Sequence, residues 1–175
     1  MGFAAATLVA GWASDETSGR LELVLATLLA RRAWAVRSGQ GVFLAITLMT
    51  IVFALAVGIG ALLAGSDAVT PMAGSVTLGL YAAALAGAGF AIGGLLRTSI
   101  AAEIVALIVT VTFLIDLLAP ALRLPDWVHG LALTAHMGQP MVGSWDIGGI
   151  PACLVLAIGG LLLGGLGMSR RDVGR

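Results

Sequence analysis

The chain has 175 residues, of which 59% are hydrophobic and only 10% charged, and its nine basic residues balance nine acidic ones. An ordinary soluble domain carries about 25% charged residues, so this composition excludes a water-soluble globule. The zero formal net charge argues against nucleic acid as a partner. The basic residues are all arginine, and without lysine there is no P-loop for ATP.

The first apolar stretch, residues 3–13, is too short to cross a bilayer. As a helix it would span about 16 Å, half of the ~30 Å hydrocarbon core. It is either an interfacial stub or the end of a crossing helix whose beginning is missing. We favour the second interpretation, and assign residues 1–13 to a truncated helix end.

Residues 14–37 form an amphipathic stretch that contains four arginines and three acidic residues. Leu21, Val24, Leu25 and Leu28 have the spacing of one helical face. This helix either lies on its own bilayer or is presented to a groove of a partner protein. The mixed charge favours the partner, because Asp15, Glu16 and Glu22 would be repelled by anionic lipid.

Four segments are long and apolar enough to cross a bilayer as helices, namely residues 41–64, 72–96, 99–119 and 150–168. Unpaired backbone groups are costly in lipid, which makes helices the economical choice, and these segments lack the alternation of a β-barrel. The sequence therefore predicts an all-α integral membrane fold, with four full spans, an N-terminal stub and a cytoplasmic amphipathic coupling helix.

The arginines predict the orientation of these spans. Four crossings place eight arginines on one side and leave only Arg123 on the other, within the segment 120–149. The arginine-rich side is expected in the cytoplasm and residues 120–149 outside, in the inner (plasma) membrane of the cell. Trp12, Trp34, Trp127 and Trp145 fall near span ends or outside the spans, as expected of an aromatic belt.

Glu103 and Asp116 lie within the third span, where a charge at mid-bilayer costs about 2.5–3.5 kcal/mol. They are either part of a proton or cation relay or simply close to the two span ends, and we favour the span ends. Their spacing of 13 residues puts them on different helical faces. Two GxxxG pairs, Gly89 with Gly93 and Gly160 with Gly164, are either packing faces or chance in a glycine-rich chain.

Residues 120–149 contain three prolines and two histidines and are too broken to cross, so short helices at the outer surface are expected. His129 and His136 lack a third ligand, and we expect no metal site and no catalytic residue. Cys153 is the single cysteine, which excludes an internal disulfide.

One run of residues resembles the cytoplasmic coupling segment of type-2 ABC exporter permeases. It comprises Asp15-Glu16, Gly19, Leu21-Glu22, Val24-Leu25 and Thr27, followed by Arg31-Arg32. The basic tail Arg170-Arg171-Asp172 fits the same family, and residues 136–140 are similar to its antibiotic-exporter branch, of the kind found in actinobacteria. Leu28 stands where that family usually has proline, so the helix can continue toward Arg31.

The resemblance implies the C-terminal portion of a permease that exports a lipophilic antibiotic, drug or lipid. Its partners would be a cytoplasmic ABC ATPase dimer, which binds the ATP, and a second permease half. This chain would itself bind no cofactor and would not be an enzyme. The implied ATPase contacts are Glu16, Leu21, Glu22, Val24 and Leu25.

Two alternatives remain open at this point. A membrane anchor or assembly protein would use the amphipathic helix to bind lipid. An ion-coupled carrier would use Glu103 and Asp116 and need no ATPase.

Overall fold

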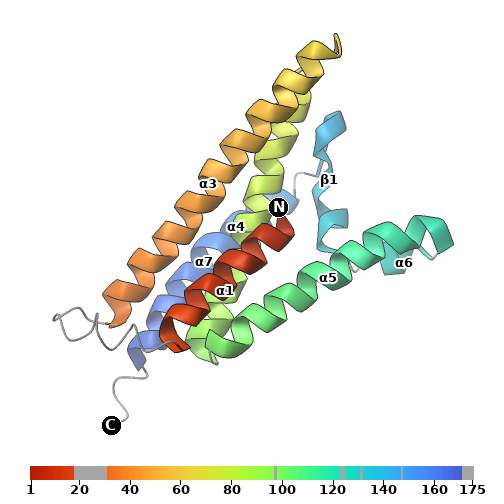
Figure 1. Cartoon of the computed structure of the whole chain (residues 1–175). Coiled ribbons are helices and arrows are strands. Elements are labelled where there is room, and N and C mark those ends of the chain that lie inside the picture. The colour runs from red at the N-terminus through yellow and green to blue at the C-terminus, as the bar shows by residue number, and fades with distance from the viewer. Residues whose placement is uncertain (18–30, 97, 123–124, 131, 147, 171–175) are drawn as a thin grey trace.

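The computed structural model describes residues 1–17, 31–96, 98–122, 125–130, 132–146 and 148–170 (Figure 1). Four of its helices are long and apolar enough to cross a membrane. They are α3 (Arg31–Leu63), α4 (Val69–Leu95), α5 (Thr98–Leu122) and α7 (Gly149–Arg170), and a shorter helix, α1 (Gly2–Thr17), precedes them. The predicted all-α membrane fold with four spanning helices and an N-terminal stub is confirmed. The predicted coupling helix falls largely on residues 18–30, outside the described residues.

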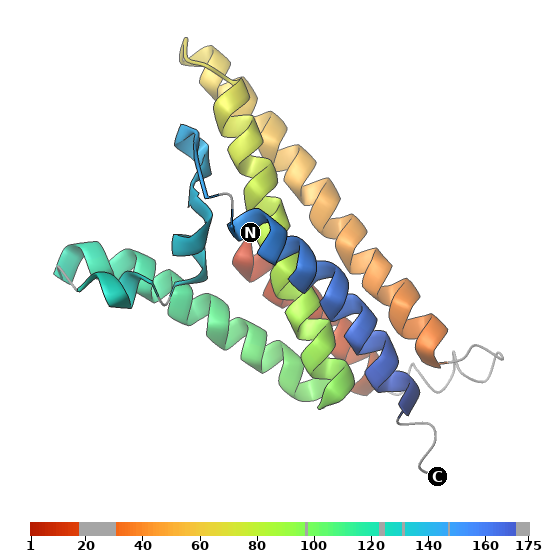
Figure 2. The ribbon, with the colours of Figure 1, turned by 180° about the vertical axis from the view of Figure 1, so that it is seen from behind.

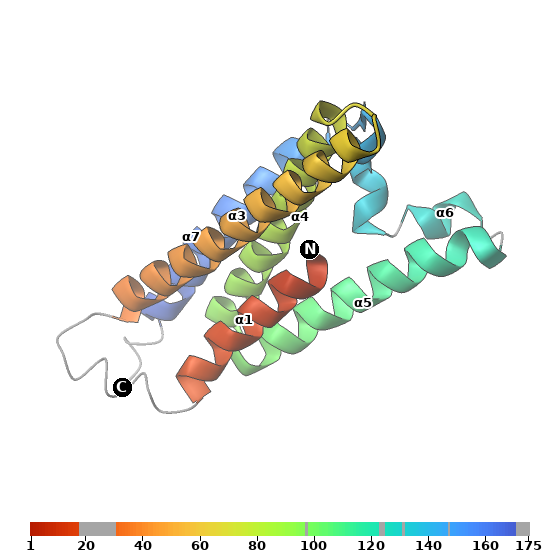
Figure 3. The same ribbon diagram turned by 45° about the horizontal axis from the view of Figure 1, so that its top comes forward.

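Helix α4 is the central element of the bundle. It contacts α7 and α3 on one side and α1 and α5 on the other (Figures 1 and 2). Helix α1 lies alongside α5 (Figure 3). Helix α5 diverges from α4 toward its own C-terminal end, so these two helices form a wedge (Figures 1 and 2).

Several helix ends and one turn lie together at one end of the bundle. Helix α1 ends there, α3 begins there, α4 turns into α5, and α7 ends beside them (Figures 1 and 3). Arg31, Arg37 and Arg170 belong to the segments of α3 and α7 at this end. We call it the inner end, and the opposite one, with the α3–α4 turn, the outer end.

The α3–α4 turn is defined by local hydrogen bonds. Gly65 has a φ of +70°, and the amides of Gly65 and Ser66 donate to the carbonyls of Leu62 and Ala61, 3.0 and 2.9 Å away, which closes α3 with a Schellman motif. Asp67 then accepts hydrogen bonds from the amides of Val69 and Thr70 at 3.1 and 3.0 Å, so its carboxylate caps the start of α4.

The outer segment between α5 and α7 contains short elements that bridge the wedge. They are α6 (Asp126–His129), η1 (Leu133–Met137), β1 (Gly138–Gln139), η2 (Pro140–Val142) and β2 (Ser144–Trp145). The two strands are antiparallel, with Gly138 opposite Trp145 and Gln139 opposite Ser144. The η2 turn packs on α4 and η1 contacts α5, so this segment joins the two helices at their outer halves (Figure 1).

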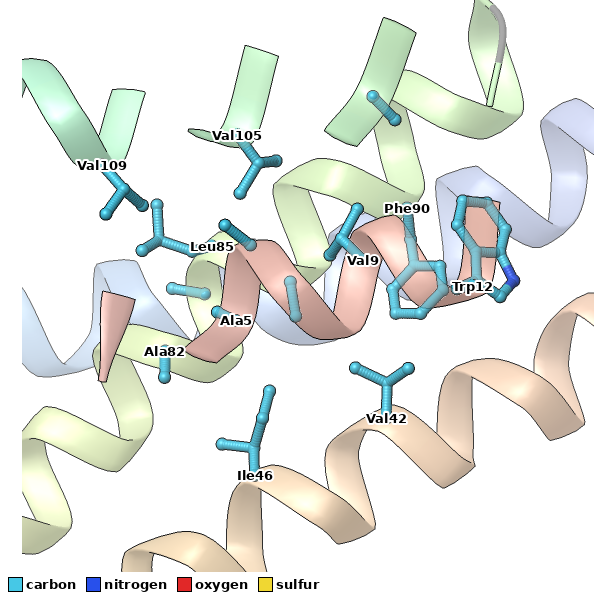
Figure 4. Packing of buried hydrophobic residues seen from close by; sticks show 14 of the residues in the cluster. Ala5, Val9, Trp12, Val42, Ile46, Ala82, Leu85, Phe90, Val105 and Val109 are labelled. Atoms are coloured by element: carbon cyan, nitrogen blue, oxygen red, sulfur yellow. The ribbon is translucent and has the colours of Figure 1, made fainter. Parts of the chain in front are cut away.

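Apolar side chains fill the interior and also cover much of the outer surface. Figure 4 shows the buried cluster, in which Ala5 and Val9 of α1 lie between residues of α3, α4 and α5. On α3 an apolar stripe is exposed, with Leu44, Leu48, Val52, Leu55, Ile59 and Leu62 each more than half exposed. A stripe of this kind suits contact with lipid.

Candidate functional site

The predicted ATPase contacts belong to the end of α1 and to the residues that follow it in the sequence, before α3. Leu21, Glu22, Val24 and Leu25 fall on residues 18–30, outside the described residues, and Glu16 is in the last turn of α1 without a described side chain. The described structure does bring the end of α1 and the start of α3 to the same end of the bundle (Figure 3). The roles of these five residues as ATPase contacts remain predictions.

Directly above the inner end, an aromatic cluster links α1, α3 and α4. The ring of Trp12 on α1 packs edge-on against the ring of Phe90 on α4, with the ring centroids 4.6 Å apart. The ring of Phe43 on α3 also contacts Phe90, with the centroids of these two rings 6.0 Å apart. The indole Nε1 of Trp12 donates a hydrogen bond to Oγ of Ser38 on α3 at 3.1 Å. The two helices that flank residues 18–30 therefore both contact Phe90. Figure 4 shows the Trp12 ring beside Phe90.

The aromatic-belt prediction is wrong for Trp12. Its side chain is only 4% exposed, because it fills the space beside Phe90 and Gly93. Trp127 and Trp145, at 69% and 40% exposed, are accessible as a belt requires. The signal in the sequence was the i, i+4, i+7 spacing of Ala5, Val9 and Trp12, which marks one buried face of α1.

A glycine seam joins α4 to α7 at backbone contact. A side-chain carbon added at Gly160 would lie 2.7 Å from Cα of Gly87, and one added at Gly164 would lie 2.6 Å from the carbonyl oxygen of Phe90. A carbon added at Gly94 would in turn lie 2.5 Å from Cα of Gly164. The Gly160–Gly164 pair is thus a packing face, as one of the two interpretations expected.

The other predicted pair, Gly89 and Gly93, faces side chains rather than a helix backbone. A carbon added at Gly89 would meet the methyl groups of Val9 and Val105 at 2.9–3.1 Å, and one at Gly93 would meet the Trp12 ring at 2.7 Å. These two glycines make room for α1 and α5. Both GxxxG pairs therefore contribute to packing, but against different kinds of neighbour.

Asp116 lines a cavity in the outer half of the wedge. The cavity has a volume of about 310 Å³, and its lining includes Asp116 and Thr112 from α5, Tyr81 from α4 and Thr134 from η1, together with Met1 and Gly2 at the start of α1. The Thr134 hydroxyl donates a hydrogen bond of 2.6 Å to Oδ2 of Asp116. Thr112 and Tyr81 line the cavity together, from α5 and from α4. Three elements thus converge on one carboxylate.

The backbone adds a further acceptor at the same residue. Pro120 lies inside α5, which continues to Leu122 instead of ending at Ala119 as the sequence suggested. Proline has no N–H to donate to the carbonyl four residues earlier, and that carbonyl belongs to Asp116. One proline so close to the end of α5 removes one ladder bond without ending the helix.

Glu103 is separated from this cavity. Its side chain is exposed on α5, and 13 residues of helix put it about 20 Å from Asp116 along the axis. The structure does not bring these two acidic residues together, which removes the geometric basis for a relay between them.

The histidines do not form a metal site in the described part of the chain, where no group of three or more potential ligands occurs. Nε2 of His136 lies 2.9 Å from the carbonyl oxygen of Gly130, which ties η1 to the preceding turn. The side chain of His129 is outside the described residues.

The fold and these features define a multi-pass, α-helical membrane protein. Residues 1–168 match the family described as "Multidrug efflux system permease Rv1217c, C-terminal domain", and the chain belongs to this family. Membership in an efflux permease family, and correspondence to the C-terminal portion of such a permease, are thereby confirmed. No curated protein and no solved structure matches the chain.

Family membership gives the chain a role in transport. A permease works in a membrane and with other components of its transporter.

Proposed function

We propose that this chain is the membrane-spanning portion of an ATP-driven ABC exporter, in which residues 14–37 contact a separate cytoplasmic ATPase dimer. The observation that supports this most strongly is the aromatic cluster above the inner end. Because Trp12 and Phe43 both contact Phe90, a displacement of the segment between α1 and α3 is transmitted directly to α4.

The proposed motion separates two parts of the bundle. Helices α4 and α7 move as one body, since their seam is a contact between backbones. Helix α5 meets α4 through side chains and a cavity, and this junction changes during transport. Shifting the bundle from one conformation to the other, from a ratio of 1:99 to 99:1, needs about 5.5 kcal/mol of difference in the binding of the ATPase to the two conformations. The ATPase must therefore hold the coupling segment firmly.

The inner end is cytoplasmic in this proposal, and the protein lies in the plasma membrane. The arginine excess at the inner end supports that orientation. A second permease half completes the transport path, and the substrate passes between helices of the two halves. The largely apolar lining of the wedge cavity supports a lipophilic substrate.

Reversing one charge in the coupling segment tests the proposal. Glu22→Arg should abolish both co-purification of the ATPase and substrate-stimulated ATP hydrolysis, because Glu22 is proposed to pair with a basic residue of the ATPase groove. Glu22→Asp, which keeps the charge, should retain both. Membrane insertion and elution in detergent should be the same for the two variants. Full coupling in Glu22→Arg would refute the proposed contact.

A further inference from the structure

An apolar groove runs along α3, where this helix faces α4 and α7 (Figure 2). Its inner part has a volume of about 410 Å³ between α3, α4 and α7, and its outer part has a volume of about 300 Å³ between α3 and α4. Both parts are lined by Phe43, Leu80 and Ala83, so they are continuous. We call this surface the α3 groove, and its lining comes entirely from α3, α4 and α7.

The length of the α3 groove matches one leaflet of a bilayer. At the inner end α3 and α7 touch, since a carbon added at Gly39 would lie 2.5 Å from Cδ1 of Leu161. From Gln40 to Ile51 the groove then follows α3 for about 16 Å, at 1.5 Å per residue. Half of the ~30 Å hydrocarbon core, which is the share of one leaflet, has nearly the same depth.

The walls of the groove offer hydrocarbon rather than polar groups to a ligand. Leucine and isoleucine side chains of α7 form one wall. The hydroxyls of Thr47 and Thr50 on α3 donate hydrogen bonds of 2.8 and 2.7 Å to carbonyls of their own helix. Because these donors are already used, the groove suits a flexible hydrocarbon chain.

The inner end of the groove is polar and basic. Gln40 lines it, and Arg37, three residues earlier on the same helix and therefore its neighbour on the surface, is exposed. The three helices that form the groove contain no acidic residue, so nothing on them repels an anion. Basic groups between spanning helices at this level recognise anionic lipid head groups, and a guanidinium binds phosphate through two parallel hydrogen bonds.

We propose that the α3 groove holds one acyl chain of an anionic phospholipid whose phosphate is bound by Arg37. The amide of Gln40 donates to the same head group, and the chain lies over Leu80 and Ala83 of α4. The lipid belongs to the leaflet at the inner end, which is the cytoplasmic leaflet in the orientation proposed above. This site does not depend on the ATPase or on what is exported.

The head-group preference is measured on the whole protein in nanodiscs made of equal parts of palmitoyl-oleoyl phosphatidylglycerol and phosphatidylcholine. These lipids have the same acyl chains and differ in the charge of the head group. Native mass spectrometry counts the lipids that stay bound after release from the nanodisc. The unsubstituted protein should retain phosphatidylglycerol about fivefold more often than phosphatidylcholine, which is the effect expected of one arginine near a membrane surface.

Substitutions of arginine assign this preference to one residue. Arg37→Gln should make retention of the two lipids equal, because the groove itself is unchanged, whereas Arg37→Lys should keep most of the preference. Arg123→Gln removes a charge that follows α5 in the sequence, and should leave the preference unchanged. Equal retention of the two lipids by the unsubstituted protein, or an undiminished preference in Arg37→Gln, would overturn the proposal.

Filling the groove tests where the acyl chain lies. Ala83→Phe places a ring on the floor that both parts of the groove share, so retention of both lipids should be lost. Ala152→Phe, at an exposed position of α7 outside the groove, should retain both lipids. Equal elution in detergent checks that the two variants fold, and the exposed Arg37 tests the head-group contact independently of them. Unchanged retention in Ala83→Phe would contradict the assignment.

A protein segment is the competing occupant of the groove. If Ala83→Phe releases a bound permease half while lipid retention persists, the groove is a protein contact and the proposal is wrong. Neither measurement involves ATP hydrolysis. Failure of the lipid site would therefore leave the exporter proposal standing, and loss of the Glu22 contact would leave the lipid site intact.

Discussion

The two flanks of α4 are built in opposite ways. Toward α7, glycine meets glycine and the two backbones touch, so that no side chain can adjust. Toward α5, the inner half of the wedge is filled by Val9 and Trp12 of α1, and the outer half contains the cavity at Asp116. Backbone contact makes a rigid pair of helices, whereas a side-chain-filled junction can repack. The difference identifies where a transport motion is accommodated.

The strongest way to disturb the side-chain junction is to remove Trp12. Trp12→Ala should lower the free energy of unfolding by about 3 kcal/mol, because a buried ring, its contact with Phe90 and its bond to Ser38 are all lost. It should also reduce substrate-stimulated ATPase activity, since α1 is no longer anchored on α4. Thermal unfolding in detergent and ATPase assays measure the two effects.

Trp127→Ala is the matched control for this change. Trp127 is 69% exposed, so the same truncation there should shift the unfolding temperature little. Equal destabilisation by the two tryptophan variants would contradict the structural role of Trp12.

The seam is tested by adding one methyl group. Gly160→Ala should cost about 1–3 kcal/mol, because the new carbon would lie 2.7 Å from Cα of Gly87 and neither backbone can move aside. Gly159→Ala, one residue earlier on α7, has nothing within 4 Å and should be neutral.

A glycine that faces α1 and α5 gives a second comparison for Gly160→Ala. Gly89→Ala should be tolerated better than Gly160→Ala, since Val9 and Val105 can shift their methyl groups. If the Gly89 variant proves the less stable of the two, the assignment of the rigid and adjustable flanks is reversed.

A smaller effect is expected at the bond that closes the outer wedge. Thr134→Val should cost about 1 kcal/mol, because it removes the hydroxyl that donates to Asp116 while keeping the shape of the side chain. Thr110→Val on α5 is the control, since its hydroxyl bonds to Ala106 of its own helix. Unfolding temperatures that do not separate the two variants would argue against a link between η1 and α5.

The smallest effect should come from Asp67, which lies outside the spans and near neither flank. Hydrogen bonds from the Thr70 hydroxyl, and from the amides of Thr70 and Val69, hold the pKa of this carboxyl below its ordinary value. Its contribution to stability is therefore full above the unfolded-state pKa and is lost as pH falls through the lower folded-state pKa. Asp67→Ala should lower the unfolding temperature slightly at pH 7, and this difference should disappear in strong acid. A difference that grows with acidity would have the wrong sign.

The spanning helices could be predicted from sequence because length and apolarity alone determine them. Their partners could not, since segments that are apolar all round give no preferred face. Gly160 and Gly164 suggested close packing, but only the structure shows Gly87 and Gly94 opposite them. Trp12 was misassigned because its position near a helix end outweighed the buried spacing of α1.

The polar residues illustrate the same limit. Glu103 and Asp116 look alike in sequence, as two acids in one apolar span. What distinguishes them is Thr134, 18 residues further along the chain, which reaches Asp116 from a separate element. Contacts of this kind depend on the fold of the outer segment, for which the sequence predicted only short helices.

Distance measurements between spin labels test most directly whether the two flanks behave differently during transport. In a Cys153→Ala background, labels at the exposed positions Val69 and Val155 span the α4–α7 seam, and labels at Val69 and Leu117 span the α4–α5 wedge. With the ATPase bound, addition of ATP and vanadate should change the wedge distance and leave the seam distance constant. A seam distance that changes while the wedge distance stays fixed would contradict the account.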